Sequence, residues 1–243
     1  MSLKNILLAL ATGFLLALSW PTSGFSPLSF IGFVPLLLAE FDIRKDNFKR
    51  KVETNEGTKN FNCINGQLIF SKKEYAVKFS DIFFVKVGGV SGLDSIFSHQ
   101  KGNMNFVCST THKNKKTKKM FYNTKNQYLR EHKEKLLSRK IKSFNEDNWW
   151  CWGRDFYNSN EKRIYVNCKT RSSDPFFTHR CKNYDGSVLA IFPKNQKLSI
   201  QKLCKMLNEV DWNDLGFMCG NRYIFSQRSL ENTILPKEFA SQL

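Results

Sequence analysis

The residues best suited to chemistry in this sequence are polar and basic side chains that recur along one predicted strand, residues 163–171. Its alternation predicts that Tyr165, Asn167 and Lys169 project together from the face opposite the apolar residues. In the major groove of DNA, asparagine can pair with adenine, and lysine or arginine with guanine. The strand therefore predicts a base-reading surface, although such side chains are also common on any exposed strand.

Two other clusters fit the same chemistry. Residues 112–119 hold five lysines in eight positions, which is typical either of a solvated hairpin tip or of a loop that contacts phosphates. Three tryptophans within residues 149–152, followed by Arg154, predict a sealed core. The alternative is a surface that offers Arg154 and one aromatic face to nucleic acid.

The sequence lacks the motifs of nucleotide binding, metal binding and nucleophilic catalysis. Gly88–Gly89 permits a tight loop, but no Gly-Lys-Ser/Thr follows it and the dinucleotide glycine spacing is absent. The seven cysteines include no Cys-x-x-Cys, and the four histidines have no metal-ligand or nucleophile spacing. We therefore expect no metal site, no catalytic residue, and reduced thiols, many of them buried.

Charge and hydropathy divide the chain into two parts. Residues 5–39 include no charged side chain, and residues 1–45 contribute +1 to the net charge of +17, which leaves +16 for residues 46–243. This excess predicts a polyanionic partner, nucleic acid first and anionic lipid second; a merely soluble basic protein is the alternative. Two domains are predicted: a hydrophobic membrane-type segment, 1–45, and a basic domain, 46–243.

The hydrophobic segment consists of two apolar stretches, 6–20 and 25–38, each shorter than the roughly 20 residues of a full bilayer crossing. Together they fit two membrane segments, or one helix and an interfacial return; a cleaved secretory signal is the alternative. Positive charge at both ends predicts that both ends stay in the cytoplasm. We expect residues 46–243 in the cytoplasm, with inner-membrane contact through residues 5–39.

Local patterns predict an α+β fold for the basic domain. A hairpin or strand is expected at 64–70, strands at 79–87 and 187–192, and a helix after the capping residue Ser199. The clearest predicted helix is 124–144. Its first residues, Thr124 and Gln127, have the spacing of a capping box, and an apolar stripe is expected to pack on the core. Its other face can follow a DNA backbone and carries Lys133, Arg139, Lys140 and Lys142.

The stretch LLALATGFLLALSWPTSGFSPLSFIGFVPLLLAE resembles the opening of bacterial apolipoprotein N-acyltransferase. The resemblance covers residues 1–45, under a fifth of the chain. That family's activity resides in a much later nitrilase-like domain, and nothing after Asp46 resembles it. We therefore expect no acyl transfer by this chain.

Residues 60–239 resemble the C-terminal target-recognition region of adenine-N6 DNA methyltransferases from type II restriction–modification systems. Gly88, Gly92 and Phe97 supply a Gly-x-x-x-Gly-x-x-x-x-Phe arrangement that recurs in such regions. The matching segments, in order, are DIFFVKVGGVSGLDSIF, MFYN, a helix ending in RKIK, NWWCWGR, IYVNCKTR, LCKMLNEVDW and FSQRSLENTILP. The resemblance implies a mixed α/β DNA-recognition domain that binds double-stranded DNA.

With this resemblance in view, we expect five cations to contact phosphate or guanine and two amides to read bases. The cations are Lys86, Arg154, Lys169, Arg171 and Arg228, and the amides are Asn167 and Gln227.

The resemblance does not extend to the family's catalytic half. Those enzymes hold S-adenosylmethionine with a Phe-x-Gly-x-Gly loop and position a flipped adenine with an (Asn/Asp)-Pro-Pro-(Tyr/Phe) tetrapeptide. Neither motif is present, and the nearest string, DPFF at 174–177, has one proline and lies within the recognition half. We therefore expect a truncated or fused chain that holds no cofactor and transfers no methyl group alone.

Three alternative classes are compatible with the sequence. The chain can be a membrane-tethered DNA-binding protein, or an N-terminal acyltransferase fragment fused to an unrelated tail. It can also be a specificity subunit whose partner is a separate methyltransferase catalytic chain.

Overall fold

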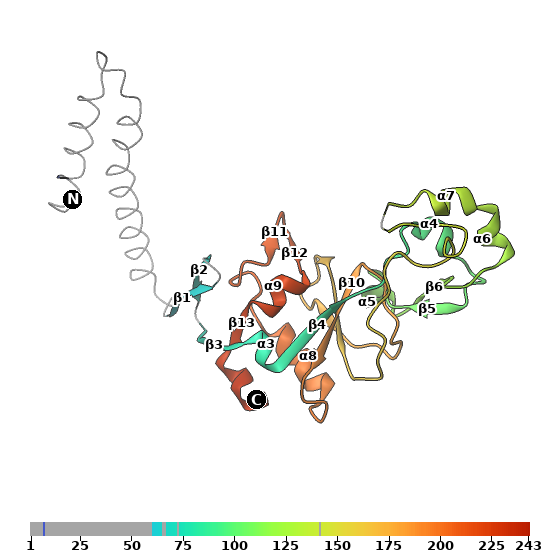
Figure 1. The fold of residues 1–243 in the computed structure, drawn as a ribbon. Coiled ribbons are helices and arrows are strands. Elements are labelled where there is room, and N and C mark those ends of the chain that lie inside the picture. The colour runs from blue at the N-terminus through green and yellow to red at the C-terminus, as the bar shows by residue number, and fades with distance from the viewer. Residues whose placement is uncertain (1–6, 8–59, 65–66, 72, 141) are drawn as a thin grey trace, which may run out of the picture. The chain divides into compact units, whose positions relative to one another are not determined.

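The computed structural model describes residues 7, 60–64, 67–71, 73–140 and 142–243 (Figure 1). The chain divides into two compact units, Met1–Asn60 and Phe61–Leu243, and the fold described below is that of the second. None of the described helices is both long and apolar enough to cross a membrane. The membrane contact predicted for residues 5–39 lies outside the described residues, apart from Leu7.

Short helices and short strands are interspersed along this unit, which confirms the predicted α+β class. The strands are β1 (Asn60–Ile64), β2 (Gln67–Ser71), β3 (Tyr75–Lys78), β4 (Phe83–Val87), β5 (Met104–Phe106), β6 (Lys118–Met120), β7 (Ile164–Asn167), β8 (Lys169–Thr170), β9 (Phe176–Phe177), β10 (Val188–Pro193), β11 (Met218–Cys219), β12 (Arg222–Ile224) and β13 (Ile234–Pro236). The helices are α3 (Phe79–Ile82), α4 (Asp94–Phe97), α5 (Thr111–Asn114), α6 (Gln127–Glu131), α7 (Lys133–Leu137), α8 (Ile200–Asn208), α9 (Gln227–Glu231) and the 3-10 helix η1 (Lys237–Gln242). Strands β1 and β2 pair with each other, as predicted around residues 64–70.

A four-stranded antiparallel sheet, in the order β4-β10-β7-β9, forms the centre of the unit. Strand β10 is buried along its whole length, as the apolar run 187–192 predicts. Its side chains alternate between two hydrophobic clusters. Leu189 and Ile191 pack into the first cluster, and Val188, Ala190 and Phe192 into the second. Both faces of the sheet are therefore covered, so neither face is free to bind a partner.

Different parts of the chain cover the two faces. Helices α8 and α9, with β13 and η1, supply the first cluster, and residues between 96 and 156 supply much of the second. Figure 1 shows α4, α6, α7, β5 and β6 gathered beyond one side of β10, away from α8, α9 and β13. The helix predicted after Ser199 is confirmed: the Ser199 side chain accepts a hydrogen bond from the Lys202 amide, and Leu203 and Leu207 are buried.

The strand predicted at residues 79–87 begins as a helical turn, α3, and becomes extended only at Phe83. Phe79, Ile82 and Phe83 are all buried and have the i, i+3, i+4 spacing of one helical face. The strand prediction was therefore wrong for the first four residues, because burial of this helical face outweighs the β-propensity of their side chains.

The single helix predicted at residues 124–144 is wrong in its cap and its length. Asn126, not Thr124, is the capping residue, and its Oδ1 accepts the Leu129 amide hydrogen at 2.9 Å. The chain then forms two short helices, α6 and α7, which meet at His132. Helix α7 ends at Leu137, and shortly beyond it Arg139 turns into the interior.

Candidate nucleic-acid interface

The end of β4 forms a tight corner that fixes Arg154. Gly88 lies so close to the 184–186 turn that a Cβ atom there would be 1.9 Å from the carbonyl oxygen of Asp185. Val90 and Arg154 exchange backbone hydrogen bonds of 2.8 and 3.0 Å, and Arg154 Nη2 donates to the Gly88 carbonyl at 3.1 Å. The glycines are therefore required by packing, while the Arg154 side chain stays exposed beside them.

Strands β4 and β7 both pair antiparallel with β10, so their last residues lie at the same end of the sheet. Arg154 is bonded to Gly88 just after β4, and Lys169 comes two residues after β7. Burial and the charge of Asp185 raise the pKa of the Cys168 thiol, while the positive charges of Arg154 and Lys169 act to lower it. Both cations are exposed, and neither forms an ion pair with a described carboxylate. The structure thus places two of the predicted phosphate contacts at one end of the central sheet.

A short hairpin adjoins this pair. Strands β11 and β12 are joined by Gly220 and Asn221, with φ of 55° and 58°, as a type I′ turn requires. Strand β12 pairs with β8 and puts Ile224 directly opposite Lys169. Met218 and Ile224 are 37% and 38% exposed, and Arg222 is also exposed. Sequence reasoning missed this hairpin, although Gly-Asn between two short strands is a hairpin signal.

The remaining predicted residues of the C-terminal half occupy different environments. Arg171 and Arg228 are exposed, after β8 and on α9 respectively. Gln227 Nε2 lies 3.3 Å from the carboxylate of Glu231, which itself accepts the Val85 amide hydrogen of edge strand β4 at 3.0 Å. Gln227 therefore orients the carboxylate that caps the sheet edge.

Lys86 is not part of the Arg154–Lys169 pair. It lies opposite Ala190 in the sheet, and its Nζ is 5.9 Å from the ring centre of Phe84 and 5.5 Å from that of Tyr157. Such cation–π contacts hold the ammonium over aromatic faces. The structure places Lys86 in a separate, aromatic setting.

Asn167 does not project from an exposed face, so that prediction was wrong. Tyr165 and Asn167 do lie opposite the apolar residues of β7, but that face is covered, and Asn167 is only 6% exposed. Its Nδ2 donates to the Ser109 carbonyl at 2.8 Å. The alternation was read correctly, but a second hydrophobic cluster covers the face that was expected to meet DNA.

Arg139 was also misassigned to a cationic surface. It is 7% exposed, and its guanidinium donates to the carbonyls of Leu136, Ser91, Cys151 and Trp149. Two of the three clustered tryptophans, Trp149 and Trp152, are 2% and 1% exposed, so the predicted core role is confirmed for them.

A second concentration of positive charge surrounds a cavity of about 740 Å³, which we call the basic cavity. The antiparallel register of β7 and β9, continued past the strand ends, brings residues 162–163 opposite 179–180. The turn after α5 adds one more cation. The basic side chains that line the cavity are Lys115, Lys162, Arg163, His179, Arg180 and Lys182. Lys115 belongs to the lysine cluster 112–119 and Arg163 to the predicted strand 163–171; the other basic side chains lie outside the clusters seen in the sequence.

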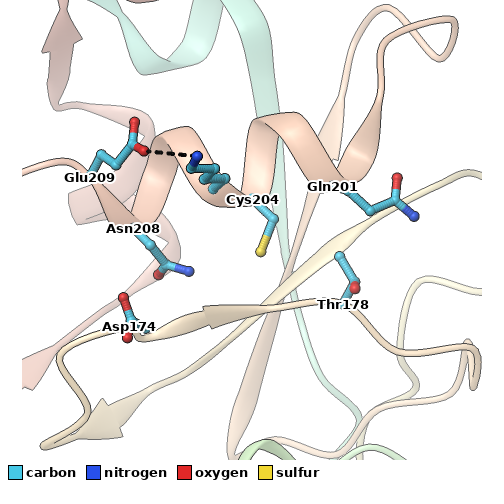
Figure 2. A pocket seen from close by; sticks show the side chains of 7 residues that line it. Asp174, Thr178, Gln201, Cys204, Asn208 and Glu209 are labelled. Carbon is cyan, nitrogen blue, oxygen red and sulfur yellow. Dashed lines mark ion pairs between the residues drawn. The ribbon is translucent and has the colours of Figure 1, made fainter.

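A smaller cavity of about 430 Å³ lies between α8 and the segment that carries Asp174 and Thr178 (Figure 2). Cys204 points into it from the helix, and burial raises the pKa of its thiol to about 11, so the thiol is protonated at neutral pH. The Asn208 side chain bonds the backbone of Phe176: its Nδ2 donates to the carbonyl and its Oδ1 accepts the amide hydrogen, both at 2.9 Å. This cavity therefore offers no activated nucleophile.

The DPFF string at residues 174–177 is not placed for base stacking. Phe176 and Phe177 are 2% and 5% exposed and pack into opposite clusters of the core. Their rings are therefore unavailable to a flipped base.

The described residues hold no group of three or more side chains suited to a metal ion. His179 Nδ1 accepts the Cys181 amide hydrogen at 3.0 Å, so this nitrogen serves the local turn. Protein atoms lie against each glycine of the Gly88–Gly89 corner: a Cβ atom at residue 88 would meet Asp185, and one at residue 89 would meet Trp152.

No family model matches this chain, and no curated protein matches it.

Proposed function

We propose that residues 46–243 bind double-stranded DNA as the target-recognition part of an adenine-N6 DNA methyltransferase of a restriction–modification system, without its catalytic half. The observation that carries the proposal is the position of Arg154 and Lys169 at the same end of the sheet, both exposed and without a described carboxylate partner. Cations in this state bind phosphates and release counterions from the duplex.

The β11–β12 hairpin supports the same assignment. The major groove admits a two-stranded β-ribbon, and this hairpin carries exposed Asn221 and Arg222 near its tip, on the strand that pairs Ile224 with Lys169. In the proposed complex, Arg154, Lys169 and Arg171 hold the backbone while the hairpin enters the groove. Arg228 follows the hairpin on α9 and adds charge to the same half of the chain.

The proposal assigns the methyl-transfer chemistry to a separate chain. That partner would supply S-adenosylmethionine and the tetrapeptide that positions the adenine. The present chain would contribute recognition only. Co-purification with a catalytic methyltransferase chain, and gain of sequence-specific methylation in the mixture, would support this division of labour.

Replacing Lys169 by glutamine should weaken binding of the full-length chain to duplex DNA roughly tenfold, because one charged phosphate contact is lost. The slope of log K against log salt should fall by about 0.9. Fluorescence anisotropy of a labelled duplex across salt concentrations of about 50–200 mM measures both quantities.

Lys237→Gln is the matched control, since it removes the same charge from a lysine that pairs with Glu74 at 3.2 Å, away from the hairpin. Its affinity and slope should equal those of the unaltered chain. Equal losses in both variants would show that Lys169 has no particular role.

A further inference from the structure

The basic cavity lies at the opposite end of β7 from the proposed DNA contacts. Lys162 and Arg163 immediately precede this strand, whereas Lys169 follows it. The basic cavity is therefore a site separate from the proposed DNA contacts, and its role is independent of the proposed function.

A buried arginine, Arg163, connects two of the segments that line the cavity. Arg163 is 5% exposed, and its Nε and Nη1 donate to the carbonyls of Glu161 and Lys182 at 3.2 and 2.9 Å. Its Nη2 donates to the Ser159 carbonyl, and its Cζ lies 4.7 Å from the ring centre of Phe192. These contacts join residues 159–163 to residue 182, so the cations on both segments are held at fixed positions.

The positive charge of the cavity is not balanced by neighbouring carboxylates. Lys162 Nζ donates to the Gln196 carbonyl at 3.0 Å, and Lys182 Nζ donates to Asn160 Oδ1 at 2.8 Å. Both acceptors are neutral, so they orient the ammonium groups without cancelling their charge. Among the lining residues Glu161 alone is acidic, and no described carboxylate forms an ion pair with the lysines or arginines of the cavity.

Size and lining define the class of ligand. A volume of about 740 Å³ is within the usual range for small-molecule sites. The lining includes no phenylalanine, tyrosine or tryptophan, so a base has no ring to stack on except that of His179. Ile200 and Gln201, at the start of α8, complete the wall; the end of the helix to which they belong carries partial positive charge. Charge, and not stacking, would determine binding.

We infer that the basic cavity binds phosphate groups, and specifically a ligand that carries at least two of them close together. Lys162 and Lys182 contact the ligand from one wall, and Lys115 and Arg180 are the exposed cations that complete its coordination. Phosphates of this kind occur on a free oligophosphate and along a nucleic-acid strand. Both sources present the same chemistry to the cavity.

Isothermal titration of the full-length chain with pyrophosphate tests the inference. The variant Lys115→Glu/Arg180→Glu reverses two exposed charges, neither of which makes a side-chain hydrogen bond with a described residue, so the fold should be retained; near-ultraviolet circular dichroism checks this. The matched control, Lys202→Glu, reverses an exposed charge on α8 that does not line the cavity.

Pyrophosphate should bind the unaltered chain and Lys202→Glu equally, and should bind the double variant at least about tenfold more weakly. Failure of the unaltered chain to bind pyrophosphate, or equal binding by the folded double variant, would overturn the inference.

Two further titrations distinguish the two sources of phosphate, and distinguish the basic cavity from the proposed DNA contacts. If a single-stranded oligonucleotide of about 12 residues displaces pyrophosphate, the phosphates come from nucleic acid; if it does not, the ligand is a free oligophosphate. Lys169→Gln should bind pyrophosphate normally, whatever its effect on duplex DNA. Loss of pyrophosphate binding in Lys169→Gln would contradict the existence of a separate site.

Discussion

Replacing Arg139 by alanine will lower the free energy of unfolding by about 3–5 kcal/mol, the cost of breaking a buried charged network. Burial lowers the pKa of Arg139 to about 10, so the guanidinium remains protonated at neutral pH and keeps all its donors. Those donors satisfy the carbonyls of Leu136, Cys151 and Trp149 at 2.8, 2.9 and 2.6 Å, and that of Ser91 as well. Alanine would leave these acceptors without their donor.

The effect should be large because the Arg139 guanidinium bonds three segments at once: the loop before α4, the end of α7 and the tryptophan segment. Its Cζ also lies 3.7 Å from the ring centre of Phe144. Urea unfolding followed by tryptophan fluorescence measures the loss. The exposed neighbour Lys140, changed to alanine, should alter stability by less than about 0.5 kcal/mol. Similar values for the two variants would rule out a structural role for Arg139.

The second large effect is expected from Gly88→Ala, which should destabilise the fold by about 3 kcal/mol. The added Cβ would lie 1.9 Å from the carbonyl oxygen and 2.4 Å from the carbonyl carbon of Asp185. Both are backbone atoms, held in place by the hydrogen bond from Gly89 N–H to the Tyr184 carbonyl. The corner must therefore open, which also moves Arg154 away from its position.

Gly220→Ala is the control for this substitution. Gly220 has φ of +55° at the tip of the hairpin, but a Cβ there meets no atom within 4 Å. The cost should be that of a left-handed conformation alone, about 1 kcal/mol. Thermal unfolding measures the stability of both variants. An equal loss of stability in the two would mean that contact with Asp185 does not limit the side chain at residue 88.

The parts of the fold that were predicted correctly are those with strong local signals. The apolar run that ends at Pro193 predicts β10, and Ser199 with the spacing of Leu203 and Leu207 predicts α8. Such signals act within one element and need no knowledge of its neighbours. The α+β class follows from them.

The wrong predictions concern exposure, because the sequence does not show which parts of the fold cover each helix or strand. Period-two alternation gives the two faces of β7 but cannot tell that both are buried, so Asn167 was assigned to DNA. Likewise, Arg139 was predicted to be a surface cation because the sequence does not show that carbonyls of other segments, those of Ser91, Cys151 and Trp149, surround it. The basic cavity was missed for the same reason, since its lining comes from segments near residues 115, 162, 180 and 200 that only the fold brings together.

The central claim is that four exposed cations, Arg154, Lys169, Arg171 and Arg228, bind the DNA backbone, and the salt dependence of duplex binding by the full-length chain tests it most directly. Engagement of Arg154, Lys169, Arg171 and Arg228 predicts that log K falls linearly with log salt, with a slope of roughly −3 to −4 at about 0.9 per phosphate. Absence of binding at about 50 mM salt, or binding that does not change with salt, would contradict the account.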